Sequence, residues 1–494
     1  MDKRWQALIL AVILLLALKV RMGLFLSASG GGAFQTPDTE HYVNLASAIL
    51  DDKAFARYSW RTQSPPEIFR TPGYPVFIIG GQEAGETLGL WGPYQSVVFC
   101  QLILDVALVG LTFWLGLLLV APWAGLVAAL LQAISPLAVA SSCRLVSDSL
   151  YALCFTASLV LLIKYMRSGR WWMLAASGVV LGLSCYVRPV AIVMAGVIGF
   201  FLLLWRGRKI GEGLAPVSAD GARSANPQAE EKGIPSPVER WGKTVLSRFG
   251  RAGIFVGVFL ACLAPWVLRN IRVADYYGFS SFSSDAMYSF AAADVIARTE
   301  GIDGQTGRDR LKRDADEYAE RPGVTVGDAA RWRQRKAWEI IGQDPWLYAK
   351  IHAKGCLGFW LPGATDVLEI AGLTQGNRDT LEVLKTRGLG AAIEHYFGDN
   401  VRAIALAAPM VAFTLVQYVA ALICAARGVR RKVPLEAWML AAIVLVSSAL
   451  PGPFGLPRYR LPVEPILNIA AAVGLLAFVS LLRRRWAGPL PSNS

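Results

Sequence analysis

Charged side chains are scarce in this chain. Asp, Glu, Lys and Arg make up 17% of its 494 residues, whereas about a quarter is usual in a soluble domain. There are only three histidines, none close to another along the chain, which argues against a histidine-built metal site. The seven cysteines lie mostly in apolar stretches without the spacing of zinc sites or disulfide frameworks, so they are expected to be small core residues.

Apolar residues are abundant and fall in long runs. They make up 54% of the chain, and the runs reach about twenty residues, the length needed to cross a hydrocarbon core of roughly 30 Å. The first run contains Lys19 and Arg21 near its outer end, where long side chains can extend to the interface. The predicted spans are 8–26, 97–120, 121–140, 149–163, 172–187, 190–205, 254–268, 404–425, 438–450 and 466–482.

Basic residues give the expected orientation. Five groups occur in alternate short loops: Lys3 and Arg4; Lys164, Arg167 and Arg170; Arg206, Arg208 and Lys209; Arg427, Arg430, Arg431 and Lys432; and Arg483, Arg484 and Arg485. Ten spans bring all five groups to one side, which the positive-inside rule makes cytoplasmic. The sequence therefore predicts an all-α polytopic integral membrane protein. Its net charge of +13 is largely explained by this topology and by lipid headgroups, so nucleic acid is not an expected partner.

The predicted organisation follows the spans. Residues 1–205 form an N-terminal transmembrane module with a first external loop at 27–96, and residues 206–250 form a flexible cytoplasmic loop without periodicity. A single transmembrane helix (251–270), an external segment (271–400) and C-terminal transmembrane helices (401–494) complete the chain. An amphipathic interfacial helix is expected at 42–50, and cap helices are expected at 328–343 and 345–360.

Asp38 is the first candidate for chemistry. It follows Pro37 after the first span, in a turn that leads to the interfacial helix. A structural interpretation is that Asp38 caps this helix, a position that Asp favours. The functional interpretation is a carboxylate near the membrane face that acts as a general base, with Glu40 and His41 beside it as acceptor-binding or supporting residues.

The segment Arg70-Thr71-Pro72-Gly73-Tyr74-Pro75 ends the same loop. Its prolines restrict the backbone, while Arg70 and Tyr74 offer donors suited to a phosphate. A rigid turn whose arginine touches lipid headgroups is the structural alternative.

Further basic residues are predicted at the same external depth. The candidates are Arg144 beside Asp148 as acceptor or supporting residues, and Arg188, Arg269, Arg458 and Arg460 as phosphate-binding residues. Each one alone could be an interfacial anchor or part of a structural ion pair. Topology does not require positive charge on this face, so an anionic ligand, foremost a lipid phosphate, would explain the group.

The order of these motifs resembles that of GT-C fold glycosyltransferases that use polyprenyl-phosphate sugars, in the bacterial branch related to protein O-mannosyltransferases and lipid A aminoarabinose transferases. The matching pieces are the Asp38 and Arg70–Pro75 segments, Asp148, Arg188-Pro189, Ala-Pro-Trp-Val-Leu-Arg-Asn at 264–270, Asp-Pro-Trp-Leu-Tyr at 344–348 and Arg-Tyr-Arg-Leu-Pro at 458–462. Two departures stand out. Asp148 is single where an acidic pair is common, and Arg70 replaces the lysine of the aminoarabinose branch.

The resemblance implies a GT-C-like bundle of about ten spans with a small external helical cap. It also implies transfer of a sugar from a polyprenyl-phosphate donor to a glycan, lipid or protein acceptor, with Asp38 as the base and inversion at the anomeric carbon. The expected location is a bacterial inner membrane, with the site facing the periplasm or exterior. No cofactor is expected, and the isolated carboxylates give a divalent metal no support. A ligase using a diphosphate-linked donor and a lipid or sugar transporter remain alternatives.

Overall fold

The computed structural model describes residues 2–28, 31–51, 55–56, 65–89, 91–206, 237–374, 380–398, 400–429 and 433–486. Helices dominate this part of the chain, whose only β-pairing is one isolated bridge between Ala56 and Pro66. The helices of the bundle are α1 (Lys3–Ser27), α4 (Pro93–Leu119), α5 (Pro122–Ile134), α6 (Pro136–Ser142), α7 (Asp148–Ser168), α8 (Trp171–Cys185), α9 (Ala191–Leu204), α10 (Pro237–Ala274), α18 (Val401–Val429), α19 (Leu435–Ala449) and α20 (Glu464–Trp486).

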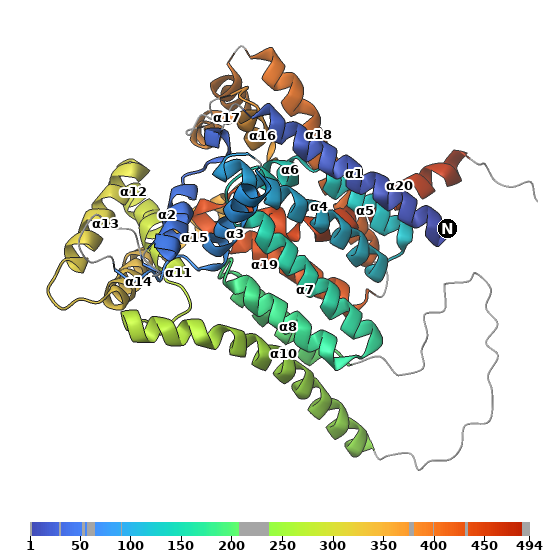
Figure 1. Ribbon diagram of the computed structural model, residues 1–494, viewed down its shortest axis with the longest axis horizontal. Helices are drawn as coiled ribbons and strands as arrows, with labels where there is room; N and C mark the ends of the chain where they lie inside the picture. Colours follow the sequence, from blue (N-terminus) through green and yellow to red (C-terminus); the bar gives the residue numbers. More distant parts are fainter. Residues whose placement is uncertain are drawn as a thin grey trace, which may run out of the picture.

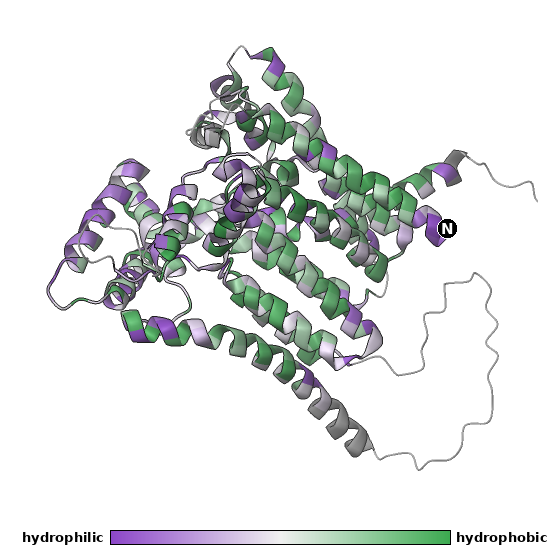
Figure 2. Ribbon diagram, viewed as in Figure 1, coloured by the Kyte–Doolittle hydropathy of each residue, from purple (hydrophilic) through white to green (hydrophobic). Residues whose placement is uncertain are grey.

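The remaining helices build the external part. They are η1 (Gly31–Phe34), α2 (Thr39–Asp51), α3 (Gly73–Leu88), α11 (Phe282–Ala286), the π-helix η2 (Met287–Ala292), α12 (Ala293–Glu300), α13 (Gly304–Ala319), α14 (Val326–Gln343), α15 (Pro345–Phe359), α16 (Ala364–Ile370), α17 (Thr380–Phe397), η3 (Gly452–Phe454) and η4 (Pro457–Val463). Apolar residues cover the bundle, whereas polar residues gather on α12–α14 (Figure 2). The start of α1 and the end of α20 lie on the side of the bundle opposite these cap helices (Figure 1).

The described chain is an all-α polytopic membrane protein, as predicted, but ten complete spans are not confirmed. Six of its helices are long and apolar enough to cross a membrane, or seven if α5 and α6, bent by 56°, form one broken span. Nine of the ten predicted ranges each fall on one apolar helix, and 121–140 falls on the bent pair α5 and α6. However, α8, α9 and α19 have only 15, 14 and 15 residues, fewer than the roughly twenty that a straight crossing needs.

The predicted cytoplasmic loop, 206–250, extends too far toward the C-terminus. Residues 207–236 lie outside the described residues, but α10 begins at Pro237 and runs without a break to Ala274. The sequence does have a periodicity here, since Val238, Trp241, Val245 and Phe249 recur at three- and four-residue spacing. The prediction that this part of the loop has no helical periodicity was therefore wrong.

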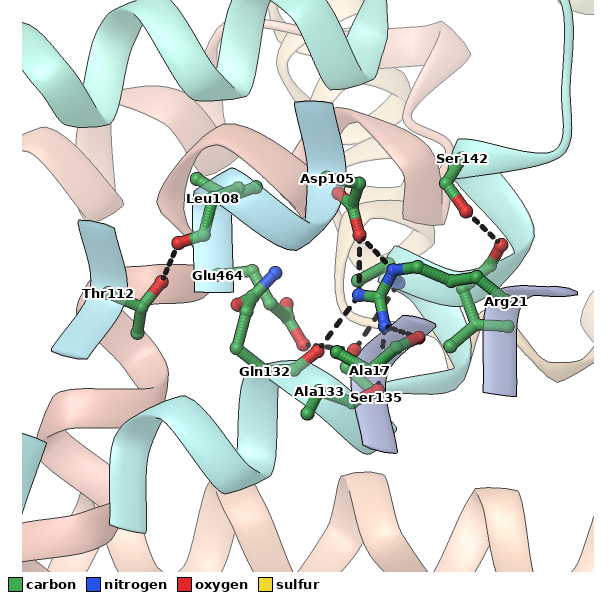
Figure 3. Close-up of polar contacts among 12 residues, drawn as sticks. Ala17, Arg21, Asp105, Leu108, Thr112, Gln132, Ala133, Ser135, Ser142 and Glu464 are labelled. Atoms are coloured by element: carbon green, nitrogen blue, oxygen red, sulfur yellow. Dashed lines mark hydrogen bonds and ion pairs between the residues drawn. The ribbon is translucent and has the colours of Figure 1, made fainter. Parts of the chain in front are cut away.

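A buried ion pair ties the first helix to the break between α5 and α6. Pro136 has no N–H, so carbonyl groups at the end of α5 lack helical partners. Arg21 of α1 fills this role: it donates to the carbonyl oxygens of Ala133 at 2.8 Å and Gln132 at 3.3 Å, and to the Asp105 carboxylate of α4 at 2.6 Å (Figure 3). Arg21 and Asp105 are both fully buried, so the expectation that Arg21 extends to the interface was wrong.

Both predicted helices of the cap are present: α15 begins at Pro345, as predicted, and α14 begins at Val326, two residues before the predicted start. Thr325 and Asp328 form a reciprocal capping box at the start of α14, and the Asp344 side chain accepts from the Leu347 amide at 2.8 Å at the start of α15. The expected interfacial helix at 42–50 is part of α2. The helix α3, which follows the proline turn, was not predicted from the sequence.

Glycines bring α15 against the last external loop. A Cβ atom on Gly355 would lie 2.0 Å from the Gly452 carbonyl oxygen, and one on Gly358 would lie 2.0 Å from that of Gly455. Only glycine permits this approach of two backbones. The contact fixes the loop that continues into η4, where Arg458 lies.

Candidate active site

Asp38 lies between two arginines from distant parts of the chain. One carboxylate oxygen accepts from Arg70 at 2.7 Å and the other accepts from Arg458 at 2.5 Å. Asp38 precedes α2, Arg70 precedes α3, and Arg458 lies in η4, so the bridge joins the two ends of the chain. Both side-chain oxygens thus pair with guanidinium groups, which favours a site residue over a simple helix cap.

The turn that carries Arg70 is held on both sides. The Gly73 amide donates to the Tyr186 carbonyl at 2.8 Å, and a Cβ atom at Gly73 would lie 2.6 Å from that oxygen. The Arg70 amide donates to the Glu67 carboxylate at 2.9 Å. The Arg70 guanidinium lies 4.7 Å from the centre of the Tyr42 ring and donates to the Tyr42 hydroxyl at 3.1 Å. The local fold therefore determines where this cation points.

A second ion pair lies beside the first. Arg188, just before α9, pairs with Asp148 at the start of α7. The Asp148 side chain is 1% exposed, whereas that of Arg188 is 19% exposed. The Tyr459 ring has Arg188 and Arg458 each 5.4 Å from its centre. Asp38, Arg70, Asp148, Arg188 and Arg458 are thus brought together, and we call them the arginine cluster.

The cluster carries an excess of positive charge. Three guanidinium groups face two carboxylates, which leaves one net positive charge. Burial raises the pKa of Asp38, but the charges of Arg458 and Arg70 outweigh it and hold this pKa well below its usual range. The buried Nε atoms of Arg70 and Arg458 have no hydrogen-bond partner among the described residues. The cluster can therefore accept an additional anion.

An apolar cavity of about 580 Å³ adjoins the cluster. Arg70 and Arg188 line it, whereas Asp38 and Arg458 are not part of its wall. Other polar groups of its wall include Tyr42, Ser280, Tyr348 and His352. Most of the remaining wall consists of apolar residues of α9, the α11–η2 segment and the loop after α19, which include Ile192, Val193, Met194, Phe282, Met287, Leu450 and Phe454. A cavity with cations at one end and apolar walls suits an amphiphilic anion.

Two predicted phosphate ligands have other partners. Tyr74 is fully buried and donates its hydroxyl to Gln101. Arg460 is 1% exposed and donates to Glu464 at 3.1 Å and to the Phe359 carbonyl at 2.7 Å. Neither lines the cavity. Their hydrogen bonds connect helices instead.

Arg144 and Arg269 also lie apart from the cluster. Arg144 pairs with Glu369 at 2.6 Å and with Asp366 at 3.3 Å, which attaches α16 to the loop before α7. Arg269 donates to the backbone carbonyl oxygens of Glu67 at 2.5 Å and Phe55 at 2.6 Å, and so supports the first external loop.

Glu40 and His41 are exposed on the first turn of α2 and do not line the cavity. The sequence interpretation missed Tyr42, which contacts Arg70, and Ser147, whose hydroxyl lies 3.1 Å from that of Tyr42. It also missed Tyr459. Two sequence signals could have identified these tyrosines: Tyr42 lies four residues after Asp38, and Tyr459 lies between two candidate arginines.

The described residues contain no group of three or more His, Cys, Asp or Glu side chains that could hold a metal ion. Within this part of the chain, the two cluster carboxylates pair with arginines instead.

The fold defined by this bundle and cap is that of the GT-C membrane enzymes, as the motifs predicted. A structure of the oligosaccharyltransferase AglB from Archaeoglobus fulgidus, in complex with an inhibitory peptide and a dolichol-phosphate, aligns with the whole chain at 12% identity and a TM-score of 0.54. Another structure of that archaeal oligosaccharyltransferase, tethered to an acceptor peptide, covers 98% of the chain at 13% identity and a TM-score of 0.50. The chain spans about half of these proteins, 52% and 51% of their lengths.

A family model adds a sequence match. The model described as dolichyl-phosphate-mannose-protein mannosyltransferase matches residues 92–215, a range that includes Arg144, Asp148 and Arg188. ArnT from Cupriavidus metallidurans bound to undecaprenyl phosphate covers 100% of the chain and 82% of its own length at 14% identity, with a TM-score of only 0.40. No curated protein matches the chain.

Proposed function

We propose that this protein transfers a sugar from a polyprenyl-phosphate donor to an acceptor hydroxyl at the external face of the membrane, with Asp38 as the general base. The observation that carries the proposal is the arginine cluster at the end of an apolar cavity. Arginine provides several fixed donors for phosphate oxygens, and an apolar wall suits a polyprenyl chain. The family-model match and the similarity to AglB support the same class of reaction.

The charge of the cluster favours a monophosphate donor. A phosphodiester between a polyprenyl chain and a sugar carries one negative charge, which balances the single positive excess of the cluster. A diphosphate-linked donor carries two negative charges and would leave the site with a negative excess. Burying an unbalanced charge is costly, so the diphosphate-using ligase is the second candidate. It is supported only by the likeness of the fold to an oligosaccharyltransferase.

The reaction conserves this charge balance. The acceptor oxygen attacks the anomeric carbon opposite the phosphate, which inverts the configuration there. The bond between the anomeric carbon and the phosphate oxygen breaks, and its electron pair leaves with the polyprenyl phosphate, which becomes a dianion. The acceptor proton moves to Asp38, which becomes neutral. Arg70, Arg188 and Arg458 stabilise the charge that develops on the leaving phosphate.

The apolar wall gives the donor chain a path to the bilayer. Ile192 and Val193 line the cavity and are 39% and 40% exposed on α9, which supports a lateral opening toward lipid. The acceptor would reach Asp38, whose side chain is 29% exposed, from the external side. The proposed location is a bacterial inner membrane with the site facing the periplasm. The acceptor class stays open among glycan, lipid and protein.

The direct test measures release of free undecaprenyl phosphate from undecaprenyl-phosphate sugars by the protein in lipid nanodiscs, with envelope extract as the acceptor. Asp38→Asn should lower the rate about 10²–10⁴-fold, the usual contribution of a general base. The matched control is Glu86→Gln, which removes an exposed carboxylate of α3 outside the cavity wall and should retain activity. Folded Asp38→Asn protein with near-normal turnover would contradict the assignment of the base. Sugar-lipid movement across a bilayer without release would favour a transporter.

A further inference from the structure

The two arginines that bind Asp38 are also among the three that we propose to stabilise the leaving phosphate. In the structure each of them uses one Nη atom for the Asp38 carboxylate. A carboxylate that accepts two charge-assisted hydrogen bonds binds a proton weakly. The free protein thus contains its proposed base in a form that is poorly able to accept the acceptor proton.

Because of the position of Arg70, the donor phosphate and Asp38 compete for the same guanidinium group. Arg70 lines the cavity, whereas Asp38 and Arg458 are not part of its wall. A phosphate that enters the cavity and binds Arg70 therefore meets the same guanidinium that Asp38 occupies. The unpaired Nε atoms of Arg70 and Arg458 are additional donors that a reorienting guanidinium can offer to phosphate oxygens.

We propose that the donor phosphate withdraws Arg70 and Arg458 from Asp38 and thereby converts Asp38 into an effective base. This inference rests on the proposed function. It assigns a second role to the two arginines, because they suppress the base while the cavity is empty and stabilise the leaving group while it is occupied. The donor must then bind before the acceptor hydroxyl can be activated.

The exchange also accounts for recovery of the site. After transfer, Asp38 holds the acceptor proton and the polyprenyl phosphate dianion holds the arginines. When the lipid product leaves, the guanidinium groups return to Asp38, and their charge favours release of the proton to water. The pair Arg188–Asp148 lies beside this exchange: the hydrogen bonds to the Asp38 carboxylate come from Arg70 and Arg458, and the charge of the buried Asp148 also acts on Arg458.

Modification by a hydrophobic carbodiimide tests the inference, because this reagent attacks protonated carboxyl groups. The full-length protein in nanodiscs is treated at pH 6 with and without undecaprenyl phosphate, and modification of Asp38 is measured by peptide mass spectrometry. Each unit by which the Asp38 pKa rises increases the protonated fraction about tenfold, so we expect at least a tenfold faster reaction when the lipid is bound. Asp309, exposed on α13, provides the internal reference and should react equally in both samples.

Variants separate this inference from the proposed function. Arg458→Gln should accelerate Asp38 modification without lipid, whereas Arg458→Lys, which keeps the charge, should stay slow. Native mass spectrometry of the same samples measures bound undecaprenyl phosphate independently. If the lipid does not bind, the proposed function fails. If the lipid binds and Asp38 reacts at an unchanged or lower rate, the exchange of partners is refuted, although the polyprenyl-phosphate site stands.

Discussion

Replacing Arg188 by Gln should destabilise the protein through the partner that it leaves behind. Asp148 is 1% exposed, and one of its oxygens has no hydrogen-bond partner among the described residues. Removing one member of a buried ion pair costs about 3–5 kcal/mol, because the remaining charge is uncompensated. In Arg188→Gln we expect a loss at or below the lower end of this range, because Arg188 is 19% exposed and the Arg458 charge also acts on Asp148. Donor binding should be impaired as well, because Arg188 lines the cavity.

The double variant Arg188→Gln/Asp148→Asn isolates the cause. It removes both charges, so most of the lost stability should return, and the net charge of the arginine cluster should again be one positive unit. Its donor KM should remain raised, because the guanidinium that we propose to contact the donor phosphate is still missing. Asp148→Asn alone leaves an additional positive charge and should weaken the protein less than Arg188→Gln.

Thermal unfolding in detergent and donor KM in nanodiscs, measured for all four proteins, give a complete double-mutant cycle. An unfolding temperature of the double variant as low as that of Arg188→Gln would refute the argument, because the loss would then come from packing and not from an unpaired charge. A donor KM restored by the double variant would show that net charge alone, without the Arg188 contact, holds the donor.

Two further predictions concern the bridge at Asp38 and the glycine contact. Because the folded-state pKa of Asp38 is lowered, its stabilisation is present above the unfolded value near 3.8 and is lost as the pH falls through the folded value. The unfolding temperatures of wild type and Asp38→Asn should therefore differ by a constant amount from pH 5 to 8 and converge below about pH 4; a difference that disappears near neutral pH would contradict this. Gly355→Ala places a Cβ atom 2.0 Å from the Gly452 carbonyl oxygen, so it should cost about 1–3 kcal/mol and lower turnover by displacing the Arg458 loop. Gly342→Ala, with open space around its Cβ position, is the matched control in the same stability and activity assays.

The sequence was most informative where one physical rule decides the outcome. Apolar runs predicted the helices of the bundle, because a segment in lipid has no water to bond with and forms a helix that satisfies its backbone hydrogen bonds internally. The pair Asp344-Pro345 predicted the start of α15. The length of an apolar run does not reveal a break, however. The bend at Pro136 and the short helices α8, α9 and α19 depend on packing between helices.

The candidate site was only partly accessible from the sequence. Asp38, Arg70, Asp148, Arg188 and Arg458 were selected by their charge and external depth, and the fold brings them together. The same criterion also selected Arg144, Arg269 and Arg460, which bind carboxylates or carbonyl groups of the protein itself. Charge and depth cannot separate these two sets, because the difference lies in which acceptors the tertiary structure brings to each guanidinium.

The buried polar groups of the bundle and the external site belong to one structural arrangement. Glu464, at the start of α20, accepts from Arg460, from Gln417 of α18 at 3.0 Å and from Ser135, at the break after α5, at 3.0 Å. Asn468, one turn later, receives a second bond from Gln417 at 2.8 Å. Since η4 leads directly into α20, these bonds orient the segment that carries Arg458. Polar side chains in an apolar interior are costly unless they are paired, and these groups are paired with one another. Because the same bonds hold the start of α20 against α18 and the break after α5, they also support η4, whose Arg458 reaches Asp38.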